Sequence, residues 1–174
     1  MHARIVLLPV DGENMVNAAA NAGDSTQVEN RTEGGRLLAI DMGAKRVGVA
    51  VSDELGITVR PVTTIERRSW KKLLQSVIEQ IESFDARGLV VGLPLNLDGS
   101  EGAAALEARQ VAAKFELSLE IPVYLQDERL TSEEAKSRLQ DIQQRERAGD
   151  IDSAAAAIIL QDFIGQHPRS TNTD

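Results

Sequence analysis

Cysteine is absent from the 174-residue sequence, histidine occurs twice, and aromatic residues make up 3% of the chain. The lack of cysteine excludes a disulfide framework, a thiolate metal site and a cysteine nucleophile, and it suits a reducing cytoplasm. His2 and His167 lie in segments that we expect to be tails, so we expect neither a histidine general base nor zinc catalysis. With few aromatic residues, the core should consist of Leu, Ile, Val and Ala.

Long apolar runs are also missing from the chain. The longest, residues 154–160, is far shorter than the roughly 20 residues that a membrane span needs. No small-residue cleavage site directly follows residues 1–8, so we expect no signal peptide and no membrane segment. A length of 174 residues fits one ordinary domain with an apolar core and is short for two.

The net charge of −8 excludes a molecule that is basic over its whole surface. Residues 1–35 contribute −3 of this charge and the rest of the chain −5. Any nucleic-acid site must therefore be a local basic patch, because electrostatics dominates affinity for phosphates. Carboxylates that bind divalent cations would explain part of the negative charge.

Low-complexity composition divides the chain into three parts. Residues 11–35 are rich in small and polar residues, so we expect residues 1–35 to be a disordered extension. A regulatory tail and an artefact of an upstream start codon are equally compatible with it. We expect one ordered domain over residues 36–166 and a flexible tail over residues 167–174.

The ordered part opens with three β-rich runs, residues 37–42, 46–52 and 57–62. Their short connections allow antiparallel pairing, whereas a parallel pair needs a long crossover, so we expect a meander. Later segments alternate helical spacing with short apolar runs that are typical of buried strands. The helices are expected over residues 70–84 after an N-cap at Ser69, 101–117, 131–140 and 152–163, and the strands over 88–93 and 123–125. This order predicts an α/β fold with a five-stranded mixed sheet, the antiparallel meander plus parallel strands, flanked by helices on both faces.

Three acidic residues stand where predicted elements begin or end. Asp41 ends the first strand, Glu128 follows the last strand, and Asp152 begins the last helix. Each also has a purely structural explanation that the sequence leaves open. Asp41 could satisfy a turn and Asp152 could cap its helix. Glu128 or Asp127 could pair with Arg129 at the surface, where such pairs contribute little.

If Asp41, Glu128 and Asp152 converge, they form a cluster of hard oxygen ligands suited to Mg²⁺ or Mn²⁺. Such ions can activate water and stabilise the leaving oxygen of a phosphodiester. The cluster would therefore allow a chain without a usable histidine to hydrolyse RNA or DNA.

Polar and basic residues near these acids are candidates for substrate binding. The loop over residues 92–100, with Asn96, could hold a phosphate at the next helix, although turn chemistry and a serine cap explain it better. Lys45 and Arg46 beside Asp41, and Arg129 beside Glu128, could contact scissile phosphates. A further basic run is more typical of a solvated face; it comprises Arg60, Arg67, Arg68, Lys71 and Lys72.

Four sequence blocks in this order resemble the YqgF family, also called RuvX. They are residues 39–43 with 46–50, residues 91–99, residues 127–131 with 134–135, and residues 152–155 with 158–160. Together they span residues 36–166. The chain departs from the family at Met42, where an aromatic residue is usual, and over residues 143–150, which are less basic than in many members.

The resemblance implies an RNase H-like fold and a bacterial cytoplasmic hydrolase, a nuclease that trims the 5′ end of pre-16S ribosomal RNA. A role as a Holliday junction resolvase on branched DNA is the alternative, and it would need a dimer, whereas RNA trimming is open to a monomer or a homodimer. By position, the resemblance assigns catalysis and metal binding to Asp41, Glu128 and Asp152.

Two other classes of function stay open. An actin- or hexokinase-like phosphotransferase also begins with an Asp-x-Gly turn, but such proteins duplicate the fold and need a longer chain. A non-catalytic RNA-binding module for ribosome assembly is the other. It would have little use for a like-charge cluster that is costly without metal.

Overall fold

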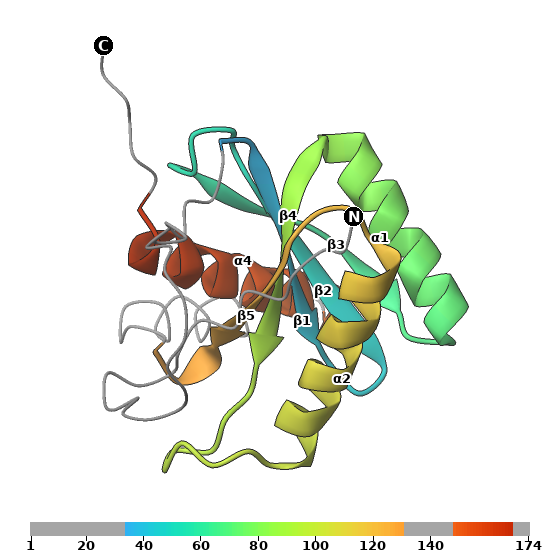
Figure 1. Cartoon of the computed structure of the whole chain (residues 1–174), viewed down its shortest axis with the longest axis vertical. Coiled ribbons are helices and arrows are strands. Elements are labelled where there is room, and N and C mark those ends of the chain that lie inside the picture. Colours follow the sequence, from blue (N-terminus) through green and yellow to red (C-terminus); the bar gives the residue numbers. More distant parts are fainter. Residues whose placement is uncertain (1–33, 131–147, 169–174) are drawn as a thin grey trace, which may run out of the picture.

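The computed structural model describes residues 34–130 and 148–168 (Figure 1). The predicted extension up to residue 33, the helix predicted over residues 131–140 and the last six residues of the predicted tail lie outside these ranges. The elements in the described ranges are β1 (Arg36–Met42), β2 (Arg46–Ser52), β3 (Val59–Glu66), α1 (Trp70–Phe84), β4 (Ala86–Leu93), α2 (Ala103–Ser118), β5 (Val123–Asp127), the 3-10 turn η1 (Glu128–Leu130) and α4 (Ala148–Gln166). None of these helices is long and apolar enough to cross a membrane.

The five strands form one mixed sheet in the order β3-β2-β1-β4-β5. β2 pairs antiparallel with both β1 and β3, whereas β4 pairs parallel with both β1 and β5. The predicted meander with two added parallel strands is therefore confirmed. Side chains alternate between the two faces along a strand, so Leu38 and Ile40 of β1 share one face. Leu37 and Ala39 lie on the opposite face, and Asp41 continues their series.

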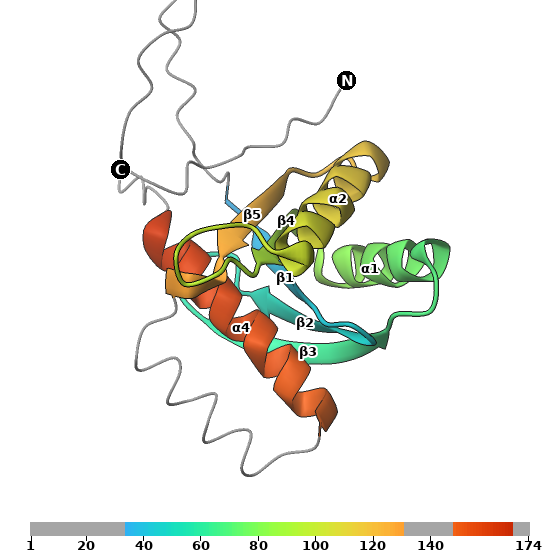
Figure 2. The ribbon, with the colours of Figure 1, turned by 90° about the horizontal axis from the view of Figure 1, so that it is seen from below.

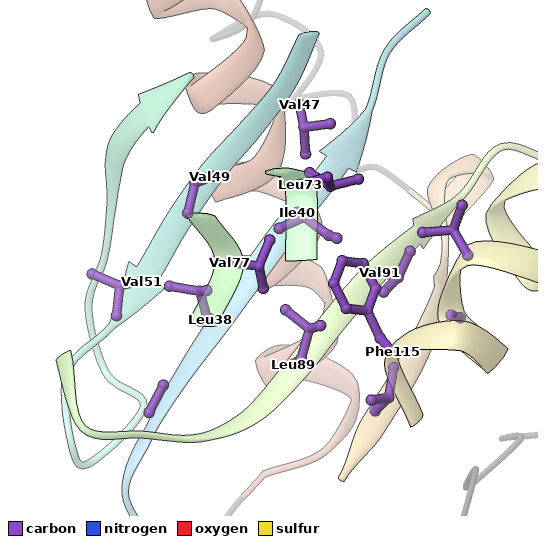
Figure 3. Close-up of a cluster of buried hydrophobic side chains, with 14 residues drawn as sticks. Leu38, Ile40, Val47, Val49, Val51, Leu73, Val77, Leu89, Val91 and Phe115 are labelled. Carbon is purple, nitrogen blue, oxygen red and sulfur yellow. The ribbon is translucent and has the colours of Figure 1, made fainter. Parts of the chain in front are cut away.

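Helices cover both faces of the sheet, as the element order predicts (Figure 2). On one face α1 and α2 pack over a large apolar core in which Val77 and Phe115 are fully buried (Figure 3). Ser69 caps α1, because its hydroxyl accepts a hydrogen bond from the backbone N–H of Lys72. On the other face α4 packs Leu160 and Phe163 against the sheet.

Three boundaries differ from the sequence prediction. β3 runs to Glu66 because it pairs with the whole of β2, so backbone pairing sets its length. β5 includes Asp127, which was expected in a loop. The last helix begins by Ala148, four residues before Asp152, so the prediction that Asp152 stands at the helix start is wrong.

Candidate active site

Asp41 lies near the end of β1, on the sheet face that α4 covers. Its register partner on β2 is Gly48, and the preceding residue, Ile40, pairs with Val91 of β4. The carboxyl group is partly buried, and this burial, together with the negative charge of Asp152, raises its pKa from 3.8 to about 6. Asp41 on the sheet therefore lies close enough to Asp152 on α4 for their charges to interact.

Asp152 reaches the site because α4 packs very closely on β2 at Gly48. A Cβ atom at position 48 would stand 2.8 Å from the backbone nitrogen of Ser153 and would overlap the carbonyl group of Asp152. Only glycine leaves room for the helix backbone here. Asp152 is thus brought in by helix packing, and its place in the second turn of α4 removes the N-cap explanation.

Arg46, at the start of β2, makes an ion pair with Asp152. Its Nε atom lies 2.8 Å from Oδ2 of Asp152, and both side chains are partly exposed. That oxygen is itself buried, and the described residues offer it no well-aligned hydrogen bond, since the Arg46 contact is close without being directed. A buried carboxylate oxygen without a directed donor is costly unless another cation or donor serves it.

Glu128 enters the site from the turn η1, directly after β5. Its carboxylate occupies the space over Gly92 of β4, where a Cβ atom would overlap Oε1 of Glu128 and stand 2.8 Å from Cδ1 of Ile159. Burial, together with the negative charges of Asp41 and Asp127, raises the pKa of Glu128 from 4.5 to about 7. The structure therefore brings together Asp41, Glu128 and Asp152 from three separate elements.

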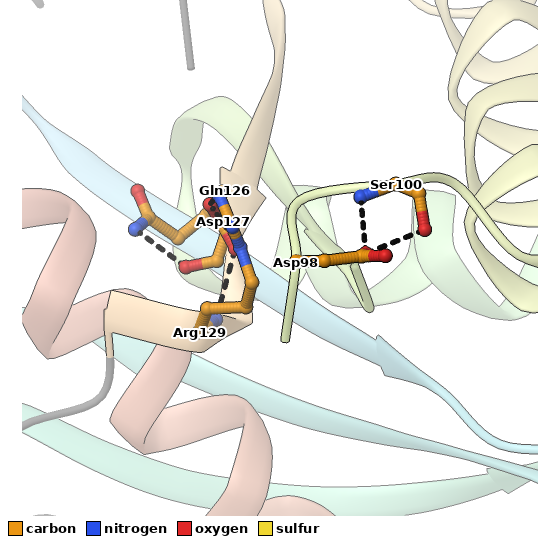
Figure 4. Close-up of polar contacts among 5 residues, drawn as sticks. All are labelled: Asp98, Ser100, Gln126, Asp127 and Arg129. Carbon is orange, nitrogen blue, oxygen red and sulfur yellow. Dashed lines mark hydrogen bonds and ion pairs between the residues drawn. The ribbon is translucent and has the colours of Figure 1, made fainter. Parts of the chain in front are cut away.

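Arg129 is held by Asp127 (Figure 4). Its guanidinium donates from Nε and Nη2 to the Asp127 carboxylate, with Nη2 2.7 Å from Oδ2, and its backbone N–H donates to Oδ1 at 2.9 Å. The predicted pairing is confirmed, but the Asp127 side chain is only 3% exposed, so this is not a loose surface pair. It fixes the turn that carries Glu128.

The loop between β4 and α2 is closed by its own polar groups. Asp98 accepts hydrogen bonds from the hydroxyl and backbone N–H of Ser100, which lower the pKa of its carboxyl (Figure 4). Asn96 donates to the Ser100 hydroxyl at 2.8 Å. Gly99 takes a φ of 87°, which suits the turn. Turn chemistry is confirmed, although the N-cap of α2 is Gly102 and not the predicted serine.

The three carboxylates are neighbours, but in the described ranges no group of three acidic or histidine side chains is arranged to hold one metal ion. Carboxylates without a cation repel each other, and Asp152 pairs with Arg46. The raised pKa values of Asp41 and Glu128 nevertheless fit a site that binds a cation. The buried Oδ2 of Asp152, which has no directed donor, fits such a site as well. This donor set, all oxygen, suits a hard divalent ion.

Comparison with known proteins agrees with this arrangement. Residues 35–166 match the family model described as "RuvX: Holliday junction resolvase". The chain belongs to the RuvX family. A relative from Anaeromyxobacter sp. (strain K), provisionally named a pre-16S rRNA nuclease, is 45% identical over 131 residues, which cover 74% of this chain and 96% of the relative. A relative of the same name from Syntrophus aciditrophicus is 39% identical, covering 74% of this chain and 87% of the relative.

A solved structure resembles this RuvX chain in fold alone. T. thermophilus RuvC in complex with a Holliday junction substrate has a TM-score of 0.51 and 14% identity, and the match covers 78% of this chain and 98% of RuvC. The RNase H-like fold predicted from the sequence blocks is thereby confirmed.

The sequence did not single out two residues that shape the site of this RuvX chain, Gly48 and Gly92. Both lie inside buried strands, where glycine weakens a strand and often marks the close approach of another group. That rule could have singled them out. It could not have said that α4 approaches one of them and a carboxylate the other.

Proposed function

We propose that this RuvX family member is a metal-dependent nuclease of the cytoplasm that hydrolyses phosphodiester bonds in the 5′-end processing of pre-16S ribosomal RNA. One observation carries the proposal: Asp41, Glu128 and Asp152 gather on one sheet face, and two of them have raised pKa values because each is buried near another. The provisional names of the relatives support ribosomal RNA as the substrate.

Asp41, Glu128 and Asp152 would hold Mg²⁺ or Mn²⁺, the ions that all-oxygen ligand sets favour. Bound there, a divalent cation would polarise the phosphoryl group and lower the pKa of the attacking water. Asp152 would serve the ion through its buried Oδ2, the oxygen that now pairs with Arg46. Arg46 and the exposed Lys45 beside it would serve the phosphate.

Two further residues that the sequence suggested for substrate binding, Arg129 and Asn96, hold parts of the site in place. Arg129 holds Asp127 and so keeps Glu128 in place, and it also lies beside the loop at Gly99. Asn96 shapes this loop through Ser100.

Cleavage of branched DNA is the second candidate, because the family model is described by that activity. The two functions differ in what they require of the protein. A resolvase cuts two strands symmetrically and needs a dimer, whereas trimming of RNA needs only one site.

A panel of labelled substrates tests the proposal and separates the two candidates. We expect cleavage of RNA containing the 5′ precursor end of 16S rRNA in the presence of Mg²⁺ or Mn²⁺, none in EDTA, and weaker or no cleavage of a four-way DNA junction. Preferred cutting of the junction by a dimeric protein would favour the resolvase. Binding of RNA that is equal with and without metal, and without cleavage, would indicate a non-catalytic module.

Metal affinity should depend on pH near neutrality. Glu128 and Asp41, with pKa values of about 7 and about 6, hold protons that a cation must displace. The affinity for Mn²⁺ should therefore rise from pH 5.5 to pH 8, by up to about tenfold for each pH unit over which one proton is released. Calorimetric titration in buffers of different ionisation enthalpy would measure both quantities, and a flat profile with no proton release would contradict the assignment.

A further inference from the structure

The basic residues that follow β3 line two cavities next to the turn between β1 and β2. One cavity, of about 210 Å³, is bordered by Ala44 of that turn, by Arg68 and Trp70, and by Lys114 of α2. The other, of about 450 Å³, is bordered by Lys45, Arg46 and the same Arg68. These residues gather positive charge at one place in a chain whose net charge is −8.

The smaller cavity combines an apolar floor with a cationic rim. Leu73 and Val111, both buried, form the floor together with the indole of Trp70. The indole packs on Phe115 with a centroid distance of 4.9 Å, so its orientation is fixed. The exposed Lys114 holds its ammonium group 5.6 Å from the centre of the Trp70 ring. The ammonium group lies over the indole ring, so a base that stacks on Trp70 would take its place, and Lys114 could then pair with the phosphate of that nucleotide.

Acidic residues also face this region and decide which cations are available. Arg67 is tied down, because it pairs with Glu107 and donates to the carbonyl oxygen of Gly43 at 3.2 Å, and it therefore shapes the wall. Arg68 pairs with Glu66, but both side chains are 67% exposed, so a phosphate can compete for the guanidinium. Arg68 and Lys114 are thus the cations that a ligand would meet first.

The cavity lies within reach of a strand that is bound at the carboxylates. Ala44, which borders the cavity, stands three positions after Asp41, so the Cα atoms of these two residues are at most about 11 Å apart. Lys45 and Arg46 lie between the two places, and the backbone N–H of Arg67 donates to the Lys45 carbonyl oxygen at 2.9 Å. The carboxylates lie on the sheet face that α4 covers and the cavity lies on the face that α1 and α2 cover, so a nucleic-acid strand that contacts both sites would pass over the turn between β1 and β2.

We propose that Arg68, Trp70 and Lys114 form a second nucleic-acid subsite, which holds an unpaired nucleotide of the substrate a few positions from the bond that is cut. The proposal rests on the proposed nuclease function and adds a substrate class, a strand that is single-stranded beside the cleavage site. A paired base could not enter the cavity to reach the indole. A volume of about 210 Å³ is below the roughly 300 Å³ of typical small-molecule sites, so part of a polymer fits better than a free ligand.

Binding of a fluorescein-labelled single-stranded oligouridylate of about 12 nucleotides, within the range of such sites, tests the proposal. The full chain is titrated in EDTA over a series of salt concentrations. Arg68→Ala and Lys114→Ala should each lower the salt slope of log K by about 0.7 and weaken binding about fivefold near 0.1 M salt. Trp70 is the single tryptophan of the chain, so its emission should change on binding the oligouridylate and not on binding a blunt duplex.

Arg87→Ala is the matched control, because Arg87 also pairs with an exposed acid two residues earlier, Asp85. Arg87 lies at the start of β4, at the opposite end of the sheet from Asp41, and its loss should leave the slope unchanged. Unchanged binding by both Arg68→Ala and Lys114→Ala, an equal loss in Arg87→Ala, or an unresponsive Trp70 would each overturn the subsite. If the wild type still cleaves RNA with metal, the proposed function survives that result.

Discussion

Asp41→Asn should abolish metal-dependent cleavage while leaving the protein folded. Asparagine keeps the size of the side chain but loses the charge that a divalent ion requires, and the transition state should lose several kcal/mol of stabilisation. We expect cleavage of precursor RNA to fall by about 10³-fold or more, since each 1.36 kcal/mol corresponds to a factor of ten. Single-turnover assays with Mg²⁺ and with Mn²⁺ would measure the loss, and wild-type cleavage by the variant would remove Asp41 from the site.

The same substitution should stabilise the metal-free protein at alkaline pH, which separates loss of chemistry from loss of fold. Folding raises the pKa of Asp41 from 3.8 to about 6, so its contribution to stability is fully present below pH 4 and is lost as the pH rises through 6. At pH 8 the ionised Asp41 costs on the order of 1–3 kcal/mol, allowing for its partial exposure. Thermal unfolding in EDTA should therefore show a higher Tm for Asp41→Asn at pH 8 and no difference near pH 4.

The sheet could be predicted from the sequence because its signals are local. The short connections after the first two strands require antiparallel pairing, and the long crossovers through α1 and α2 allow parallel pairing. The ends of elements were less predictable. β3 extends to Glu66 because β2 offers it a pairing partner. α4 already includes Ala148, although the residues from Ala148 to Ile151 show no helical spacing of apolar side chains.

The candidate site could be predicted as a set of acids but not as an arrangement. Asp41 lies near the end of one strand and Glu128 directly follows another, and neighbouring strand ends bring such residues together. Asp152 is different, because its helix-start explanation was wrong and the contact of α4 with Gly48 brings it in. The ion pair with Arg46 spans more than a hundred residues of sequence, and no local pattern indicates a contact at that separation.

Gly48→Ala should have the largest effect on stability of any single methyl group added at the site. The new Cβ would overlap the backbone carbonyl of Asp152, and a helix backbone cannot rotate away as a side chain can. Overpacking typically costs about 1–3 kcal/mol, and we expect at least the upper end here, measured as the loss in free energy of unfolding in urea. Cleavage should fall as well, because α4 must move and carries Asp152 with it.

Alanine substitutions at two other glycines, Gly92 and Gly165, provide a comparison for the loss of stability in Gly48→Ala. At Gly92 the new Cβ would meet the ends of the Glu128 and Ile159 side chains, which can move, so Gly92→Ala should cost less stability but still displace a proposed metal ligand. At Gly165, in the last turn of α4, nothing lies within 4 Å of a new Cβ, and Gly165→Ala should be neutral or stabilise by up to about 1 kcal/mol. A Gly48→Ala protein as stable as Gly165→Ala would show that α4 does not depend on this close approach. Asp152 would then need another explanation for its place beside Asp41.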